Sequence, residues 1–459
     1  MNYYFLGICG IGMSGIAYII KKMNLKDLVI GSDRFFDNNK NLDIKNKLEK
    51  NGIIIVPQNL EVYNKYKIDL IVVSTAISDD LLEIKEAKKR GIKIIHRSEL
   101  LNEIVKKYKH SIAISGTSGK STITALIGYI FYVGGKEPTI INGAIMNNFK
   151  KGNMLGNAIK GKNKNYVIFE ADESDGSFLN YKPETAIISN ISLDHQEITK
   201  LKELFFSFSK NVNKNLIINS DCENSNSIKF NCKKKIYKIT KNKIPGNIKE
   251  LKIEGLNISF KYKGNIIKFR YPGYYNLLNI LFSIKVAEIY KIKKEAIIKA
   301  LNTYKGLYRR FDIKLKEKNY LVLDDYAHNP DKIENFIQTI TKLQKRNFFI
   351  FQPHGFGPTN LMFEGYVNTF LKNIKRDDYL ILLPVFYAGG KINKIRDSYS
   401  IYKELKKNNF KNVYYIKERK KVIEFIKKKK IKNSVIAVFG ARDNSLNDFA
   451  NEIAKSLIK

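Results

Sequence analysis

Cysteine, histidine and long apolar runs are all scarce in this sequence of 459 residues. Its three cysteines (Cys9, Cys222 and Cys232) are odd in number and far apart, which excludes a disulfide scaffold and a cysteine-based zinc site. The uncharged stretch 121–135 is broken by Thr and Gly and is too short to cross a bilayer. No basic segment precedes the apolar N-terminus. We therefore expect a cytoplasmic protein with no signal peptide and no membrane insertion.

Acidic residues are also few. The chain has 44 Asp and Glu and 81 Lys and Arg, which gives a net charge of +37. Such a charge suggests nucleic-acid binding. The excess is mainly lysine, however, and it is spread along the whole chain beside many Asn and Ile, which is typical of compositional drift with solvated lysines. We predict attraction for phosphorylated ligands and no nucleic-acid partner. A hydrophobic content of 44% excludes a mainly disordered chain.

Short runs rich in Ile and Val alternate with longer segments of helical periodicity along the chain. This alternation is typical of βαβ units and parallel sheets. We predict three α/β domains in series, 1–107, 108–308 and 309–459, and short strands and turns over 222–269. The other predicted strands are 3–9, 28–31, 53–56, 70–74, 92–95, 111–115, 166–169, 186–189, 320–323, 348–351, 379–383, 413–416 and 435–439.

A glycine-rich turn, Gly10-Ile-Gly12-Met-Ser-Gly15, follows the first predicted strand and opens a helix. Glycines at these positions allow a tight turn and let backbone amides approach a pyrophosphate at the positive end of the helix. Asp33 comes after the second predicted strand, where it can accept hydrogen bonds from a ribose or a base. The motif predicts a nucleotide diphosphate site, with NAD as the default ligand. The alternative is a turn used only for packing.

A second glycine-containing loop, 116–122 (GTSGKST), lies between a predicted strand and a predicted helix. In a phosphate-binding loop the amides surround phosphate oxygens, Lys120 reaches the terminal phosphates, and the Ser121 hydroxyl binds Mg²⁺. The loop departs from the usual pattern because Ile114 stands at the first glycine position. We still predict a nucleoside triphosphate site.

The predicted strand 166–169 is followed by four carboxylates within six residues: Glu170, Asp172, Glu173 and Asp175. Their mutual repulsion favours a bound cation, and a solvated acidic loop is the alternative. His195 follows the next predicted strand, at the sheet edge where open α/β folds bind ligands. We predict that His195 joins hard oxygen ligands around Mg²⁺.

The third domain carries a similar pattern. Asp324, Asp325 and His328 follow one predicted strand, and His354 follows another. Three of the five histidines in the chain thus come at strand ends, which favours a functional site over core packing.

Two further pairs are ambiguous. The guanidinium groups of Arg309 and Arg310, at the second domain junction, can bind phosphate or form an ordinary solvated basic pair. Asn276 and Asn279 can cap a helix or contact an adenine.

Taken in order, the motifs resemble the Mur ligase family, the ATP-dependent amide-forming enzymes of peptidoglycan precursor synthesis. The segments that carry the resemblance are 7–17 (GICGIGMSGIA), 31–33 (GSD), 116–122 (GTSGKST), 170–178 (EADESDGSF), 190–195 (NISLDH), 309–311 (RRF), 324–330 (DDYAHNP) and 351–354 (FQPH). The resemblance implies a Rossmann-like N-terminal domain that binds a UDP-sugar, a central P-loop ATPase domain and a Rossmann-like C-terminal domain that binds an amino acid. It also implies that the glycine turn holds a UDP-sugar rather than NAD.

The resemblance implies roles for individual residues. UDP-sugar contacts are implied for Gly10, Ile11, Gly12, Met13, Ser14, Asp33 and Ser74. ATP contacts are implied for Gly116, Thr117, Ser118, Gly119, Lys120, Ser121, Thr122, Asn276, Asn279, Arg310 and Asp325. Mg²⁺ ligands are implied for Ser121, Glu170 and His195, and catalytic roles for Lys120, His195, Arg310, His328 and His354. Lys210 stands at the offset where many relatives carry a carbamylated lysine.

The implied activity is the ATP-dependent joining of L-alanine to the carboxylate of UDP-N-acetylmuramate through an acyl-phosphate, by a monomer or homodimer. Ser118 and Ser121 replace the usual His and Thr of the loop, and Gly355 and Pro358 stand where close relatives commonly carry Arg. The acceptor is therefore the part of the resemblance with the least support. The alternatives are a recycling ligase that adds a preformed peptide and a catalytically inactive UDP-sugar-binding regulator.

Overall fold

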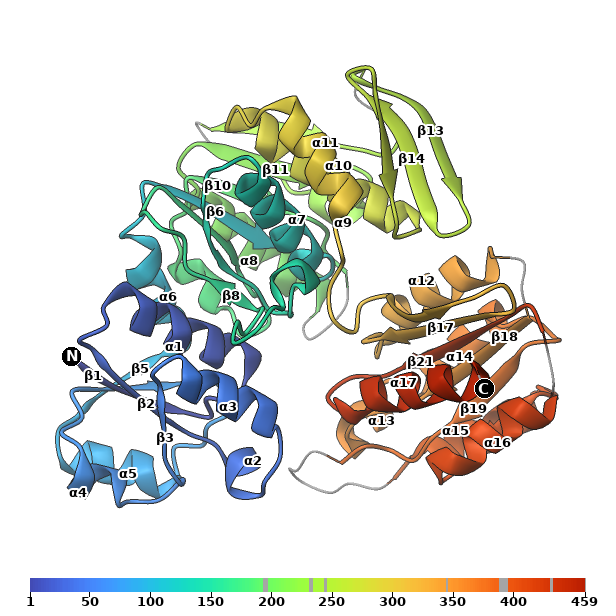
Figure 1. The fold of residues 1–459 in the computed structure, drawn as a ribbon, viewed down its shortest axis with the longest axis horizontal. Helices are drawn as coiled ribbons and strands as arrows, with labels where there is room; N and C mark the ends of the chain where they lie inside the picture. Colours follow the sequence, from blue (N-terminus) through green and yellow to red (C-terminus); the bar gives the residue numbers. More distant parts are fainter. Residues whose placement is uncertain are drawn as a thin grey trace. The chain divides into compact units, whose positions relative to one another are not determined.

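The computed structural model describes residues 1–192, 197–230, 234–242, 246–343, 346–387, 395–429 and 432–458. Its internal contacts divide the chain into two units (Figure 1). The first unit consists of residues 1–252 and 258–306, and the second of residues 253–257 and 307–459.

The first sheet has the strand order β3-β2-β1-β4-β5, and its strands are parallel. Its strands are β1 (Asn2–Leu6), β2 (Leu28–Ser32), β3 (Ile54–Ile55), β4 (Leu70–Val73) and β5 (Lys93–His96). The accompanying helices are α1 (Ile11–Met23), α2 (Arg34–Asp37), α3 (Leu42–Lys50), α4 (Val62–Lys65), α5 (Leu82–Lys89) and α6 (Arg97–Val105). The central strands are apolar along almost their whole length because helices cover both faces of a parallel sheet.

The second sheet has the order β12-β11-β10-β6-β9-β7-β8. Its strands are β6 (His110–Ser115), β7 (Thr139–Ile141), β8 (Ala158–Ile159), β9 (Tyr166–Glu170), β10 (Thr185–Ile188), β11 (Asn215–Asn219) and β12 (Lys235–Ile239). Its helices are α7 (Lys120–Val133), α8 (Ile198–Lys210), α9 (Glu223–Asn226), α10 (Tyr274–Ile289) and α11 (Lys294–Thr303), with 3-10 turns η1 (Asn147–Phe149) and η2 (Ser177–Asn180). The sheet is parallel except at its edge, where β8 runs antiparallel to β7.

Three strands form a small separate sheet in the order β13-β14-β15: β13 (Ile248–Glu254), β14 (Asn257–Tyr262) and β15 (Asn265–Phe269). β14 and β15 form an antiparallel hairpin, and β15 packs against α11. This part of the chain confirms the predicted short strands and turns, except that it also contains the one-turn helix α9.

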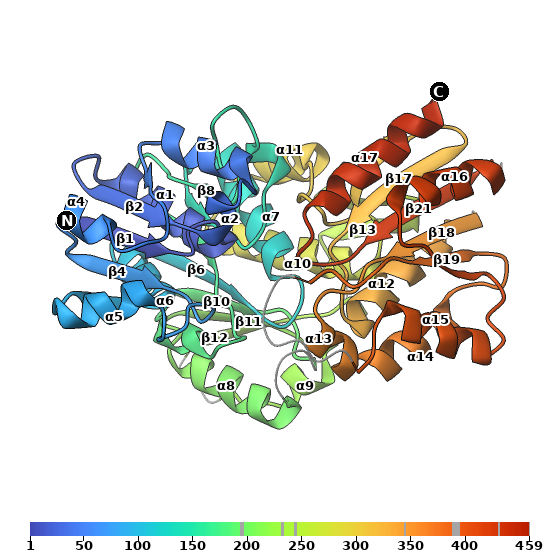
Figure 2. The ribbon, with the colours of Figure 1, turned by 90° about the horizontal axis from the view of Figure 1, so that it is seen from below.

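The third sheet has the order β16-β17-β21-β18-β19-β20. Its strands are β16 (Asp312–Lys316), β17 (Tyr320–Asp325), β18 (Arg346–Phe351), β19 (Tyr379–Leu382), β20 (Val413–Tyr415) and β21 (Ser434–Phe439). Its helices are α12 (Pro330–Thr341), α13 (Phe356–Leu361), α14 (Phe363–Asn373), α15 (Ser398–Lys407), α16 (Arg419–Lys429) and α17 (Ser445–Ile458). Figure 2 shows α16 and α17 on one face of this sheet and α12, α14 and α15 on the other.

The strands confirm the predicted α/β class, because each of the thirteen predicted runs forms a strand within about three residues of its expected limits. The predicted parallel sheets are confirmed except at two edges, where β8 and the unpredicted β16 pair antiparallel to their neighbours. Only three residues, 317–319, join β16 to β17, and a parallel crossover cannot be made over so short a connection. Among the described residues, no helix combines the length and apolarity needed to span a bilayer.

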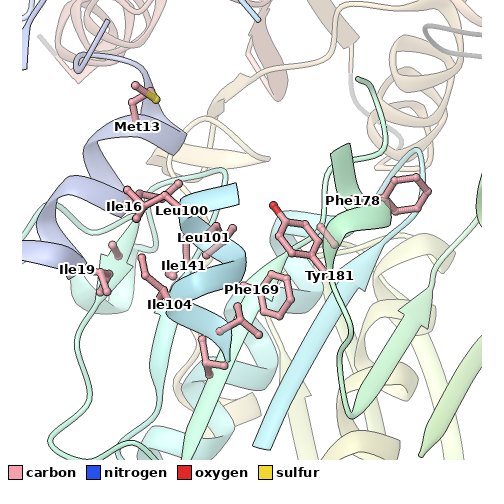
Figure 3. Packing of buried hydrophobic residues seen from close by; sticks show 14 of the residues in the cluster. Met13, Ile16, Ile19, Leu100, Leu101, Ile104, Ile141, Phe169, Phe178 and Tyr181 are labelled. Carbon is pink, nitrogen blue, oxygen red and sulfur yellow. The ribbon is translucent and has the colours of Figure 1, made fainter. Parts of the chain in front are cut away.

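One hydrophobic cluster joins the first two sheets (Figure 3). From the N-terminal side, α1 contributes Met13 and Ile16, and α6 contributes Leu101. From the middle sheet, Phe169 at the end of β9 and Phe178 in η2 belong to the same cluster. All five side chains are less than 5% exposed. The two domains that the sequence separates at residue 108 therefore share a core and lie in one unit.

We predict that Leu101→Ala destabilises both sheets together. Deletion of a leucine side chain from a packed core costs about 2–5 kcal/mol, from lost burial and from the cavity that remains. Urea unfolding followed by far-ultraviolet circular dichroism measures the shift. The matched control is Leu25→Ala, in a loop after α1, because Leu25 is 71% exposed and its loss leaves no cavity. Equal midpoints for the two variants would contradict the shared core.

Candidate functional site

The glycine turn lies where β1 passes into α1. Gly10 is the N-cap of α1, and no side chain caps the first turn of this helix. Asp33 fixes the turn from β2, because its Oδ2 accepts from the Cys9 amide at 2.9 Å and its Oδ1 accepts from the Phe35 amide at 2.9 Å. Burial raises the pKa of Asp33, while these hydrogen bonds oppose the shift. The sequence predicted Asp33 as a ligand contact, and the structure gives it a structural role in shaping the turn.

The predicted UDP-sugar residues divide into two groups. Ile11 and Gly10 are exposed at the helix start. Met13 and Ser14 point inward, Met13 into the shared core and Ser14 toward the middle domain, where its Oγ accepts from Asn157 Nδ2 at 3.2 Å. Ser74 is half-buried just after β4, which is the strand next to β1.

The phosphate loop connects β6 to α7. Gly116 (φ +122°) and Gly119 (φ +85°) have backbone conformations that other residues rarely adopt. A Cβ at Gly116 would lie 2.1 Å from Ser189 Oγ, and a Cβ at Gly119 would lie 2.9 Å from Asn279 Oδ1. The loop is thus held closely between the end of β10 and helix α10, and Asn279 lies beside it.

Asn190 fixes the middle of this loop. Its carbonyl accepts from the Thr117 amide at 3.1 Å, and its Oδ1 accepts from the Ser118 amide at 2.8 Å. The Thr122 and Ser121 amides belong to the first turn of α7, which has no side-chain cap and is therefore available to an anion. Asn276, in contrast, is buried in α10, and its amide donates to the Pro272 carbonyl.

Lys120 is the first residue of α7 and is surrounded by carboxylates. Its Nζ lies 2.8 and 3.1 Å from the two carboxylate oxygens of Glu173 and 3.5 Å from Asp172 Oδ1. Burial alone would lower the pKa of Lys120, but Glu173, Asp172 and Glu170 together raise it. Burial raises the pKa of Glu173, against the effect of the lysine. Nothing in the sequence indicates that the acidic loop pairs with the lysine of the phosphate loop.

The same acidic loop contacts the N-terminal domain. Arg97 Nη2 lies 3.8 Å from Asp172 Oδ2 and 3.9 Å from Asp175 Oδ2. Sequence reasoning missed Arg97, although it directly follows a strand (β5) at the same sheet edge as the glycine turn.

The predicted Mg²⁺ ligands can be located in part. Glu170 Oε2 accepts from the Gly143 amide at 2.8 Å, and the preceding residue, Asn142, donates to the Ser121 carbonyl at 3.2 Å. Ser121 and Glu170 therefore lie close to one short segment. His195 lies outside the described residues. Within those residues, no three His, Cys, Asp or Glu side chains form a group that could hold a metal. Lys210 is exposed at the end of α8, with its Nζ over the Phe206 ring.

The second unit contains the remaining predicted residues. Arg309, which the sequence treated as phosphate-binding or solvated, is neither, because it is only 2% exposed. Its Nε donates to Asp324 Oδ2 at 3.1 Å, and its two terminal nitrogens donate to the carbonyls of Asp443 and Gly440. Arg309 is therefore a structural anchor that the ends of β17 and β21 share.

Arg310 and Asp325 lie next to this anchor. The guanidinium carbon of Arg310 is 5.1 Å from the centre of the Tyr326 ring. Asp325 accepts from the Phe311 amide at 2.6 Å and from the Ala327 amide at 2.7 Å. Phe311 has a φ of +47°, a strained conformation for this residue type, and the Asp325 carboxylate holds it.

His328 and His354 lie together, as expected for one site, with ring centres 5.3 Å apart. His328 Nδ1 lies 2.8 Å from the Tyr326 carbonyl, which assigns the proton to this nitrogen. Burial, with Lys332 and His354 nearby, lowers the pKa of His328 to about 3. The imidazole is therefore neutral at pH 7.

Family models match the chain in three consecutive segments. The "Mur ligase family, catalytic domain" model matches residues 2–109, "Mur ligase middle domain" matches 114–287, and "Mur ligase, glutamate ligase domain" matches 309–442.

Individual proteins match over nearly the full length. The UDP-N-acetylmuramate–L-alanine ligase of Caldicellulosiruptor saccharolyticus is 34% identical, with 96% of each chain covered. The protein of the same name from Desulfatibacillum aliphaticivorans is 31% identical, again with 96% of each chain covered. Among solved structures, the UDP-N-acetylmuramate-alanine ligase of Thermotoga maritima has a TM-score of 0.78 at 24% identity, covering 100% of this chain and 99% of that one. A murein peptide ligase from Psychrobacter arcticus has a TM-score of 0.66 at 18% identity, covering 100% and 98%.

We predict that His328 makes the second unit less stable in acid. Its pKa is about 3 in the folded chain and about 6.5 when unfolded, so its contribution to stability is complete above pH 6.5 and is lost as the pH falls toward 3. Between pH 7 and pH 5 the loss should be about 1–2 kcal/mol. Hydrogen exchange of the β17 amides measures it. His328→Gln should remove most of this loss, and an unchanged pH dependence in that variant would contradict the assignment.

Proposed function

This chain belongs to the Mur ligase family, and on that basis we infer that it joins L-alanine to the carboxylate of UDP-N-acetylmuramate while ATP is converted to ADP and phosphate. It is an ATP-dependent ligase that forms an amide bond in peptidoglycan precursor synthesis. The observation that carries this conclusion is the 31–34% identity to ligases of that activity over almost the whole of both chains. The motifs of both nucleotide sites lie within segments that the family models match.

We assign the UDP-sugar to the start of α1. The amides of its uncapped first turn and the positive end of the helix dipole suit a diphosphate. Gly10 and Gly12 leave the backbone accessible at this point, and Asp33 holds the turn in shape. Ser74, after the neighbouring strand, supports the same site from the same sheet edge.

We assign ATP to the loop before α7. Two glycines in positive-φ conformations and an uncapped helix start support this assignment. Lys120, which is largely buried, supplies the positive charge. Its present partners, Glu173 and Asp172, keep the ammonium charged and oriented within the cluster. We assign Asn276 and Asn279 to contacts with the adenosine part of ATP. Asn279 lies against Gly119.

The residues present also fit Mg²⁺. Glu170, at the end of β9, has one carboxylate oxygen bound to the Gly143 amide and a second that can bind a metal. Ser121 offers a hydroxyl from the first turn of α7, and His195 completes the proposed set. Hard oxygen donors of this kind are those that Mg²⁺ prefers. When bound, the ion would neutralise negative charge on the transferring phosphoryl group.

The reaction needs no nucleophile from the protein. The lactyl carboxylate of the sugar attacks the γ-phosphorus of ATP, the bond to ADP breaks, and an acyl-phosphate forms. The amine of L-alanine then attacks the acyl carbon and phosphate leaves. Lys120 stabilises the developing charge, and the rigid pairing of the two sheets orients the reactants.

For the second unit we propose that Arg310 and Asp325 contact ATP, and that His328 and His354 contact the acceptor or the acyl-phosphate. The neutral imidazole of His328 suits this role, because it can accept a hydrogen bond from the attacking amine at neutral pH. We further propose that the enzyme acts in the cytoplasm as a monomer or homodimer.

We predict that Lys120→Ala lowers the rate of ADP formation by at least about 100-fold, because the transferring phosphate loses its buried cation. A coupled assay for ADP measures the rate. The control is Lys109→Ala, at the exposed opposite end of β6. The double variant Lys120→Met with Glu173→Gln should be equally inactive, although it also removes the charge of the carboxylate that lies closest to Lys120. Normal turnover in either Lys120 variant would contradict the ATP assignment.

The acceptor is tested by phosphate release with UDP-N-acetylmuramate and ATP across a panel of amines. We predict release with L-alanine that exceeds release with a preformed tripeptide by at least tenfold. The tripeptide is the most informative alternative acceptor, because Gly355 and Pro358 stand where the resemblance leads us to expect arginines. Faster release with the tripeptide would identify a recycling ligase. No release with any amine would identify a UDP-sugar-binding protein without activity.

A further inference from the structure

Arg97 lies against the glycine turn of the N-terminal domain. It is the first residue of α6, directly after β5. A Cβ built on Gly12 would lie 3.0 Å from Arg97 Nη1, so the guanidinium occupies the space beside the first turn of α1. Gly12 lies inside a helix, where glycine is less favourable than alanine by about 1 kcal/mol. Its φ is not positive, so the backbone conformation does not call for glycine. The lack of a side chain instead leaves room for the guanidinium.

The guanidinium of Arg97 has unused hydrogen-bonding capacity. Its closest carboxylate oxygens, on Asp172 and Asp175, are 3.8 and 3.9 Å away, beyond hydrogen-bond distance. Within the described part of the chain, Arg97 donates no hydrogen bond. Its side chain is about a quarter exposed. An arginine carries five N–H donors in a planar arrangement, and no described residue accepts a hydrogen bond from those of Arg97.

Two more polar atoms beside Arg97 are also unsatisfied. His96 Nε2 and Asp175 Oδ2 are buried, lie 3.8 Å apart and have no hydrogen-bond partner. Burial lowers the pKa of His96, and its Nδ1 accepts from the Ser98 amide, so Nε2 carries the remaining proton as a donor. Unsatisfied buried polar atoms are rare in folded chains. Two such atoms beside Arg97 indicate a site where a polar ligand or a water molecule would form the missing hydrogen bonds.

A comparison within the chain separates this arginine from a structural one. Arg309 is almost fully buried, and its guanidinium is bound by a carboxylate and two carbonyls. Arg97 has long ion pairs that orient it and leave its donors available. Bidentate binding of phosphate oxygens is the chemistry that such a planar, available guanidinium suits best.

We propose that Arg97 binds the diphosphate of the UDP-sugar, as a contact from α6 that adds to the amides of α1. The inference rests on the proposed function, because it takes the ligand at the glycine turn to be a UDP-sugar. A side chain at position 12 would crowd the guanidinium, and Gly12 avoids this. Asp172 and Asp175 hold the guanidinium in place before the ligand binds.

The test compares Arg97→Gln and Arg97→Lys in the full-length protein by isothermal titration calorimetry. The ligands are UDP-N-acetylmuramate, UDP-N-acetylglucosamine, which has the diphosphate but no lactyl carboxylate, and a non-hydrolysable ATP analogue. The matched control is Arg90→Gln, in the same domain but paired with Glu86 on α5. Thermal melting verifies that each variant is folded.

We expect Arg97→Gln to weaken both UDP-sugars at least tenfold, because a charge-assisted hydrogen bond to the diphosphate is lost. Arg97→Lys keeps the charge without the planar group and should fall between wild type and Arg97→Gln. The affinity for the ATP analogue should change less than twofold in both variants. Arg90→Gln should bind all three ligands as the wild type does.

Three results would overturn the proposal. The first is unchanged UDP-sugar affinity in Arg97→Gln. The second is a loss confined to UDP-N-acetylmuramate, which would place Arg97 at the lactyl carboxylate. The third is an equal loss for the ATP analogue, which would mean that Arg97 only supports the acidic loop. If the wild-type protein binds neither UDP-sugar, the proposed function itself is wrong.

Discussion

The shared hydrophobic core of the first two sheets is the constraint on which the proposed chemistry depends. Side chains of α1 and α6 pack with side chains of β9 and η2 in one cluster, from which water is excluded. The glycine turn begins α1, and the acidic loop lies between β9 and η2. Packing that is as dense as a protein interior therefore fixes these two functional segments with respect to each other. A phosphoryl transfer that relies on positioning needs a rigid frame of this kind.

The polar contacts across the same boundary follow from this packing. Asn157 reaches Ser14 on α1, and Asn180 reaches Ser98 on α6. Arg97 faces the acidic loop, whose Asp172 in turn faces Lys120. A continuous series of side chains thus runs from the glycine turn to the phosphate loop. In the second unit, the buried Arg309 has a comparable role, because it joins the ends of β17 and β21 beside the strained Phe311.

Most strands and all the motifs could be predicted from the sequence, because parallel strands buried on both faces appear as short apolar runs. The phosphate loop is equally local, since its glycines and Lys120 are neighbours in the chain. What the sequence does not show is which distant residues meet. The pairing of Lys120 with Glu173, the burial of Arg309 and the position of Arg97 all depend on contacts between segments far apart in the chain. The union of the first two domains depends on the same kind of contact.

The charge of the whole chain and the charge of the site have opposite signs. The chain carries +37, but around Lys120 and Arg97 there are four carboxylates of the acidic loop. Among the described residues, Lys120 and Arg97 thus supply two positive charges against four carboxylates in a partly buried region. Uncompensated buried charge is costly, and a divalent cation would balance it. This balance supports the Mg²⁺ assignment, and it explains why a triphosphate would enter such an acidic site only as its metal complex. Solvated surface lysines do not change this local balance, because salt screens them beyond about 10 Å.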